Sequence, residues 1–310
     1  MSNLDGIQYY GDHTLEHTIL QNVMQFARYG FLEIGAYRII TTGMIGPNGQ
    51  DHSRLHPVGI TGVTPYTVYA GAKPDWIYET GVTPKSAGVV APSVPSGILF
   101  NGTFIPTGSP VSGTGYYIDF SRGQVVFANP VPSGSVVQCP HSERWVSVYP
   151  KESQEYYKLV SSLDWFGSAG SSGVSLSSEQ VAYMPCLFVS IPSYDTVRGT
   201  HLGSRAKVTN VQMSFDIFAT NPNERAILQD VCYFLEDKPL PIINYKDAPR
   251  PLNYQGQLVT GVTWNTLSSS HRIANGLFKQ DARVSKPAKD HLPLKYAKVS
   301  ISLEVDLIPS

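Results

Sequence analysis

Apolar and polar side chains alternate most regularly in the C-terminal half of the chain. Residues 211–219, at the end of a strand expected over 207–219, alternate in this way, and so do residues 298–307. A period of two places successive side chains on opposite faces of a β-strand. We therefore expect two long strands, each with one buried face and one mostly polar face. A nearly continuous apolar run at 181–191, with Pro185 inside it, predicts a third strand, near a sheet edge or a bulge.

A capped helix is predicted at 221–235, directly after the first of these long strands. Asn221 is a favourable N-cap, Pro222 fits the first helical position, and Glu224 completes a capping box. A cap of this kind contributes about 1 kcal/mol. The apolar side chains that recur at helical spacing are expected to lie on the sheet: Ile227, Val231, Phe234 and Leu235.

Two further helices and a loop complete this part of the pattern. Residues 13–29 carry apolar side chains at helical spacing after a potential N-cap, Asp12, and residues 152–163 predict a shorter helix. Residues 257–264 are expected to form a strand within a long loop. The Gly/Ser-rich stretch 166–179 has the composition of a flexible loop.

The amino-acid composition changes between residues 43 and 149, where Gly, Pro, Thr and Val predominate. Asn101-Gly102 lies between two apolar runs and favours a two-residue type I′ hairpin turn. A second hairpin is expected around Gly123, which can adopt positive φ. Regular strands separated by Pro-rich stretches predict an all-β, sandwich-like domain.

Taken together, the predicted fold class is α+β with two parts. Residues 1–42 and 150–310 are expected to form a discontinuous core, a mixed β-sheet with packed helices. Residues 43–149 are expected to be an inserted β-rich domain. A chain of 310 residues can bury such a core without metal ions or disulfides.

The charge composition narrows the range of functions. Only 15% of the residues are charged, and the net charge is −1 with a pI near 6.7. A net charge this close to zero creates no general positive electrostatic potential that would bind nucleic acid or an anionic membrane. The sequence lacks a membrane-spanning apolar run and a signal-peptide layout, so assembly in a cytoplasm is expected. The odd set of cysteines, Cys139, Cys186 and Cys232, predicts buried, inert thiols.

Two clusters of ligand-type residues were weighed as metal sites. One is an HxxEH arrangement of His13, Glu16 and His17 at a helix start, and the other is Asp51-His52 with His56 in a loop. No third ligand can be named for the first cluster, and a ligand set in the second would need partners from elsewhere in the fold. A solvated helix turn and a polar loop are therefore expected instead.

No other constellation indicates catalysis. The sequence has no Gly-x-Ser-x-Gly elbow and no phosphate-binding loop. Two carboxylates suffice for glycoside hydrolysis, but acidic residues are scarce in the β-rich part. We predict a protein that is not an enzyme and uses no cofactor or metal. One set of aromatic residues can stack on a sugar or form a core and subunit interface: Tyr66, Tyr69, Trp76, Tyr78, Tyr116 and Tyr117.

The C-terminal pattern resembles the tail-terminator and tail-completion (neck) proteins of long-tailed bacteriophages. The segments that carry the likeness are MPCLFVSIP, KVTNVQMSFDIFATNPNERAILQDVCYFLED and KYAKVSISLEVDL, with the N-terminal helix, roughly half of the chain. The resemblance implies a mixed sheet with helices on one face. It also implies a virion protein of the tail or neck that forms a homo-oligomeric, hexameric ring, which caps the tail tube and joins it to the head-side connector. The implied partners are other copies of the chain, the tail tube protein and the head-closure or connector protein, and the tail sheath is a further candidate. DNA is expected to pass through the lumen without sequence-specific contact.

A second likeness concerns the β-rich part. The stretch GILFNGTFIPTGS and the hairpin that follows resemble small β domains of phage neck and tail proteins. This leaves a collar or neck role, or a receptor- or carbohydrate-binding role, as alternatives. The candidate oligomer and partner interface comprises helix residues and basic residues of a predicted loop: Asn221, Glu224, Arg225, Gln229, Arg272, Lys279, Arg283 and Lys286.

Overall fold

The computed structural model describes residues 15–46, 49–59, 64–111, 113–162, 182–198, 207–285 and 294–307, which form an α+β fold. The chain divides into two compact units. Unit 1 comprises Met1–Arg28, Ser147–Ala248 and Leu267–Ser310, and unit 2 comprises Tyr29–Val146 and Pro249–Thr266. Unit 2 is thus larger than the insertion predicted at 43–149, because it also takes in residues 29–42 and a segment from the C-terminal half.

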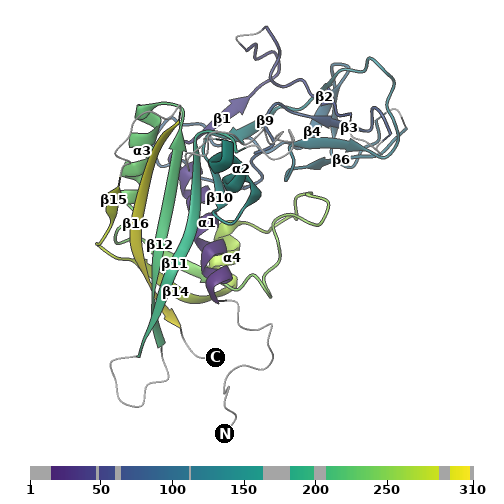
Figure 1. The fold of residues 1–310 in the computed structure, drawn as a ribbon. Helices are drawn as coiled ribbons and strands as arrows, with labels where there is room; N and C mark the ends of the chain where they lie inside the picture. Colours follow the sequence, from purple (N-terminus) through teal and green to yellow (C-terminus); the bar gives the residue numbers. More distant parts are fainter. Residues whose placement is uncertain are drawn as a thin grey trace. The chain divides into compact units, whose positions relative to one another are not determined.

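A seven-stranded mixed sheet forms the body of unit 1 (Figure 1). Its strand order is β10-β11-β12-β16-β14-β13, and β15 pairs with β16 beside β14. Only β10 and β11 are parallel. The strands are β10 (Ser147–Pro150), β11 (Cys186–Arg198), β12 (Lys207–Ala219), β13 (Pro239–Ile243), β14 (Arg272–Phe278), β15 (Arg283–Ser285) and β16 (Lys295–Leu307).

The two long strands predicted from the alternation are confirmed. β12 and β16 pair along their whole lengths, and the side chains of Phe215, Val299 and Ile301 are buried between them and their neighbours. The expected polar face of β12 is not solvated, however. Asp216 and Phe218 are fully buried, because Tyr156 and Leu159 of α2 (Gln154–Ser162) pack over that face.

The strand predicted at 181–191 is displaced in the structure. β11 begins after Pro185 and continues to Arg198, with an irregularity between Ser190 and Ser193 that contains Pro192. Proline lacks the N–H that a regular ladder requires, so the pairing shifts at this residue. β11 is paired on both sides and lies next to the edge strand β10.

Helix α1 (Leu15–Glu33) covers both edges of this sheet. The Arg28 Nη2 donates to the carbonyl oxygen of Val148 on edge strand β10, at 2.7 Å. The buried Asn22 side chain accepts from the N–H of Ile243 on edge strand β13, at 2.9 Å, and donates to its carbonyl, at 3.0 Å. The two residues are only about 9 Å apart along the helix axis, so the sheet is curled and α1 lies between its edges.

The curl also depends on residues that end the hydrogen-bond ladder at β13. This strand contains Pro239 and Pro241, which donate no backbone hydrogen bond. Its remaining outward-facing groups at Ile243 are satisfied by Asn22. The bounds of α1 also answer the sequence prediction. The helix predicted at 13–29 is confirmed over its described part, and it continues four residues further, to Glu33.

Unit 2 contains three small antiparallel sheets. The first pairs β1 (Tyr37–Ile40) with β9 (His141–Arg144). The second has the order β2-β3-β7-β6 and the third β5-β4-β8. Buried residues of the second and third sheets share one core, which includes Tyr69, Ile98, Ile118 and Val137. The remaining strands are β2 (His56–Pro57), β3 (Val68–Ala70), β4 (Gly97–Phe100), β5 (Thr103–Pro106), β6 (Tyr116–Asp119), β7 (Gln124–Phe127) and β8 (Val137–Gln138).

Both predicted hairpins of this unit are confirmed. β4 and β5 are joined by Asn101 and Gly102, whose φ angles of 49° and 83° fit a type I′ turn. Asn101 also pairs through its backbone N–H and its side chain with the backbone of Val136, which fixes the turn to the neighbouring strand. β6 and β7 form the second hairpin, with Gly123 at φ 60°.

The strand predicted at 257–264 is wrong. This segment has no neighbouring strand to pair with, and it closes on itself through a bridge between Leu252 and Leu258, which pack against the core of unit 2. The Asn253 Oδ1 accepts from the backbone N–H of Gln255 and of Gln257, which fixes the tip. Helix α4 (Trp264–Ser270) begins where the strand was expected to end.

Candidate interaction surface

Helix α3 (Pro222–Tyr233) is capped as its sequence predicts. Asn221 is the N-cap in extended conformation, and its Oδ1 accepts from the N–H of Glu224 at 2.9 Å. The Glu224 carboxylate accepts from the hydroxyl of Thr220, at 3.0 Å. The helix packs on β12 and β16. Two of the predicted interface residues therefore stabilise the start of α3.

The face of α3 that packs on the sheet is not the one expected. Leu228 and Cys232 are buried, whereas Ile227 is 62% exposed and Phe234, just beyond the helix, is 71% exposed. Val231, between them, is half-buried. We call Ile227, Val231 and Phe234, which follow one another at helical spacing, the α3 stripe. The prediction that this stripe lies on the sheet is wrong, because the helix is rotated so that the stripe faces away from the buried side.

The buried side of α3 also carries polar residues beside Leu228 and Cys232. Arg225 and Gln229 are half-buried and share the helix face of Leu228 and Cys232. Within the described residues, the Arg225 Nε and the Gln229 Oε1 are buried without a hydrogen-bond partner. These two predicted interface residues thus lie on the packing side of the helix, whereas the apolar side chains of Ile227 and Phe234 are exposed.

A second apolar surface lies on the outward face of β13 and β14. Ile273 is 49% exposed and Leu277 is 46% exposed, and both lie on the same side of β14. Pro239 is paired with Leu277 and Pro241 with Asn275, so both prolines extend this surface onto the edge strand. We call Pro239, Pro241, Ile273 and Leu277 the β13–β14 patch. The sequence analysis missed it, since β14 was assigned to a loop.

The basic residues predicted at an interface have different surroundings. Arg272 is exposed at the start of β14, and Arg283 is exposed in β15, so neither lies in a loop as predicted. The Lys279 Nζ is 2.6 Å from a carboxylate oxygen of Glu304. Lys286 lies outside the described residues. The structure therefore places Arg272 and Arg283 on two different strands and Lys279 in an ion pair.

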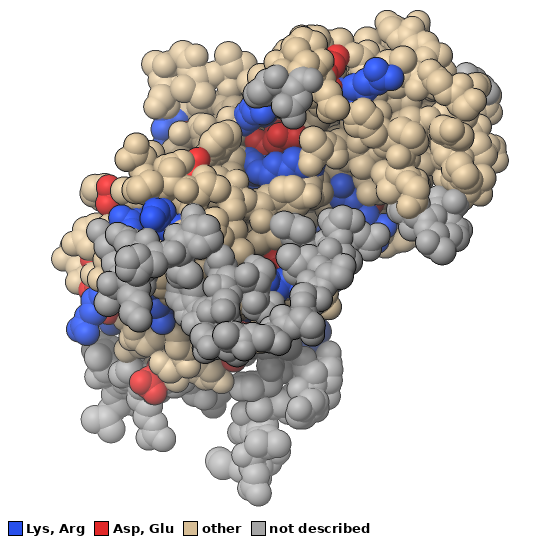
Figure 2. Space-filling view, turned by 45° about the horizontal axis from the view of Figure 1, so that its top comes forward, with Lys and Arg blue, Asp and Glu red and all other residues tan. Residues whose placement is uncertain are grey.

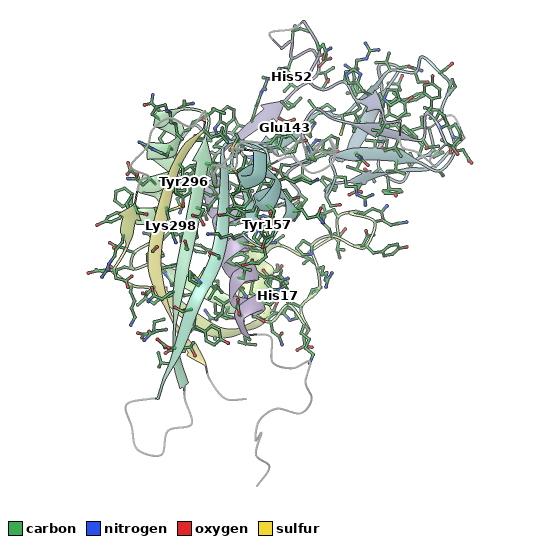
Figure 3. The ribbon with its side chains drawn as sticks, viewed as in Figure 1. His17, His52, Glu143, Tyr157, Tyr296 and Lys298 are labelled. Atoms are coloured by element: carbon green, nitrogen blue, oxygen red, sulfur yellow. The ribbon has the colours of Figure 1, made fainter. Side chains whose placement is uncertain are left out.

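Lys151, Asp216 and Tyr296 form a buried polar cluster in unit 1, which is a candidate site for catalysis. The Lys151 Nζ is 2.7 Å from Oδ2 of the fully buried Asp216, and the Tyr296 hydroxyl donates to Oδ1 of the same carboxylate. Lys298, the cross-strand partner of Asp216, follows Tyr296 on β16 (Figure 3). Burial alone would lower the pKa of Lys151, but the hydrogen bond and charge of Asp216 raise it. Burial, and then Asp216, raise the pKa of Tyr296. A protonated lysine and a protonated tyrosine favour a structural cluster over a nucleophile or base.

Unit 2 contains a second buried pair. The Arg144 guanidinium contacts the Glu79 carboxylate, with side chains only 6% and 9% exposed. Burial alone would lower the pKa of Arg144, but the charge of Glu79 raises it. The Arg144 guanidinium also lies over the ring of Tyr78, at 5.4 Å from its centroid. No signal in the sequence identifies this pair, since Glu79 and Arg144 are far apart in the chain.

The residues of the two ligand-type clusters have different surroundings. Glu16 and His17 are exposed on the first turn of α1, and His13 lies outside the described residues. The Asp51 carboxylate accepts from the N–H of Gly43, from Ser53 and from the Gln138 side chain. Over the described ranges, no three His, Cys, Asp or Glu side chains are arranged to hold a metal ion.

Several of the aromatic residues considered for sugar stacking, and all the cysteines, are buried. Tyr69, Trp76 and Tyr116 are buried in the core of unit 2 and are not available to stack on a sugar. All the cysteines are free and buried, as predicted. Burial raises the pKa of Cys232 to about 12, which leaves its thiol protonated and unreactive at neutral pH.

Comparison with known proteins gives no assignment. No protein-family model matches the chain, and no curated protein matches it either. Among the helices that the structure describes, none combines the length and apolar character needed to cross a membrane.

Proposed function

We propose that the chain is a structural protein of the phage virion. In this proposal it forms a homo-oligomeric ring, of six copies in the family it resembles, which caps the tail tube and joins it to the head-side connector. Its action is geometric, because a ring bound at the tube end covers the surface that would accept a further tube ring. The finer description of unit 1 as a tail-terminator fold belongs to the same proposal.

The architecture of unit 1 is compatible with this role. It has a mixed sheet with packed helices, and a capped helix directly follows β12, one of its three 13-residue strands. Most of the described residues visible in Figure 2 are uncharged, with Lys, Arg, Asp and Glu between them. A surface with few charges suits contacts between protein subunits better than contact with nucleic acid.

The observation that carries the proposal is the α3 stripe. A helix at a protein surface normally turns its apolar side chains toward the core. In α3, Ile227 and Phe234 are more than half exposed, while Arg225 and Gln229 are turned inward. Exposed, aligned apolar side chains of this kind mark a surface that another protein covers.

The test is assembly with and without tail tubes. Light scattering of the purified chain is expected to show oligomers or, where assembly needs the tube, binding to tube ends that stops their growth. Imaged particles are expected to place the chain at the junction of tail and head. A chain that stays monomeric, leaves tube growth unchanged and is absent from that junction would refute the proposal.

A further inference from the structure

The proposed ring requires a contact between copies, and we infer that the α3 stripe of one copy docks on the β13–β14 patch of the next copy. This inference rests on the proposed function and specifies the contact that builds the ring. Both surfaces belong to unit 1, and they differ in kind: one is a helix ridge and the other is a sheet face.

The dimensions of the two surfaces match. Ile227 and Phe234 are seven residues apart, which is about 10 Å along a helix. Ile273 and Leu277 are four residues apart in β14, which is about 13 Å along a strand. A helix ridge of this length can therefore place its end side chains against Ile273 and Leu277, with the two prolines beneath its flank.

The charges around the two surfaces are complementary. Asp230 is exposed and lies one helical turn from both Ile227 and Phe234. The β13–β14 patch has an exposed cation at each end, Arg272 before Ile273 and Lys238 before Pro239. Among the described residues these three charges form no ion pair within the chain. Their arrangement favours a second copy as the occupant. Each copy carries both the α3 stripe, with Asp230 beside it, and the β13–β14 patch, with a cation at each end.

Acidic residues beside the patch restrict the orientation of the docked helix. Asp306 of β16 is exposed and opposite Asn275, whereas the neighbouring Glu304 is paired with Lys279. Like charges at close range are unfavourable, so Asp230 should face the patch end at Arg272 or Lys238 and lie away from Asp306.

The contact is heterologous, since each copy uses two different surfaces. Head-to-tail contacts of this type produce closed rings when the rotation between copies closes. A two-fold contact of α3 with α3 would instead produce only pairs. This difference makes the inference testable with variants that each disable one surface.

The experiment uses Phe234→Asp to disable the stripe and Leu277→Asp to disable the patch. Both positions are exposed, so both variants are expected to fold, which circular dichroism verifies. Tyr157→Asp, at a comparably exposed aromatic of α2 outside both surfaces, is the matched control. Mass photometry is expected to show oligomers of the wild type and of the control, and monomers of each single-surface variant. An equimolar mixture of the two variants should give a heterodimer and nothing larger, because only one competent contact remains.

Other outcomes separate this contact from the proposed ring. Rings that persist in both variants, or a Leu277→Asp variant that still assembles, overturn the contact and leave the ring. A wild type that stays monomeric both alone and on tail tubes overturns the ring and the contact together. Where the wild type assembles only on tubes, the same variants are compared after chemical cross-linking of tube-bound protein, and loss of cross-linked multimers in both variants supports the contact.

Discussion

Replacement of Arg144 by methionine should strongly destabilise unit 2. The substitution keeps an unbranched apolar side chain of similar length but leaves the Glu79 carboxylate, which is 9% exposed, without its countercharge. Loss of one partner of a buried ion pair costs about 3–5 kcal/mol. The contact with the Tyr78 ring adds about 0.5–2 kcal/mol that methionine only partly replaces. We therefore expect unit 2 to lose at least about 3 kcal/mol of unfolding free energy.

Urea unfolding followed by tryptophan fluorescence measures this loss. Trp76, Trp145 and Trp264 all belong to unit 2, so the signal reports chiefly on this unit. The double variant Arg144→Met/Glu79→Leu removes both charges and should be less destabilised than Arg144→Met alone. A single variant within about 1 kcal/mol of the wild type, or a double variant whose loss equals the sum of the two single losses, would refute the reasoning.

Three further substitutions test other contacts. Asn22→Ala leaves the buried N–H and carbonyl of Ile243 unpaired and should destabilise unit 1 by about 2–5 kcal/mol, measured by circular dichroism during urea unfolding; an effect below 1 kcal/mol would contradict it. Gly256→Ala should lower the melting temperature, because Gly256 has φ 74° and an added Cβ would lie 1.9 Å from the Asp119 carboxylate; an unchanged transition would show that the loop yields. Burial alone would raise the pKa of Asp51, but its hydrogen bonds lower it below the usual 3.8, so its stabilisation is present above that pH and lost as pH falls through the folded pKa. Asp51→Asn should therefore be less stable than the wild type at neutral pH, and the difference should shrink below pH 3.8; a constant difference would argue against it.

The elements predicted correctly are those with strong local signals. β12 and β16 have a period of two over many residues, and the Asn221-Pro222 cap fixes the start of α3. The Asn101-Gly102 turn likewise specifies its hairpin by backbone preference. In each case a few neighbouring residues determine the conformation, so the sequence suffices.

The errors concern properties that distant residues decide. The periodicity of α3 points to the face of Ile227, Val231 and Phe234, but the packing of Leu228 and Cys232 on the sheet determines which face is buried. β14 buries Ala274 and Gly276, whose small size gives a weak alternation, and it becomes a strand because β13 and β16 flank it. The candidate surface was therefore only partly predictable: the sequence indicated α3, but its orientation and the β13–β14 patch required the fold.

The covered edges of the unit 1 sheet limit how this protein can aggregate. An uncovered edge strand offers free N–H and carbonyl groups that template the addition of further strands, and this route leads to cross-β fibrils. Here Arg28 donates to the carbonyl of Val148 on β10, Asn22 pairs with the N–H and carbonyl of Ile243, and the two prolines of β13 offer no N–H. Copies of this chain at high local concentration can therefore meet through side chains at their faces, and the shortage of free N–H groups at β13 disfavours the extension of the sheet by a strand of another copy.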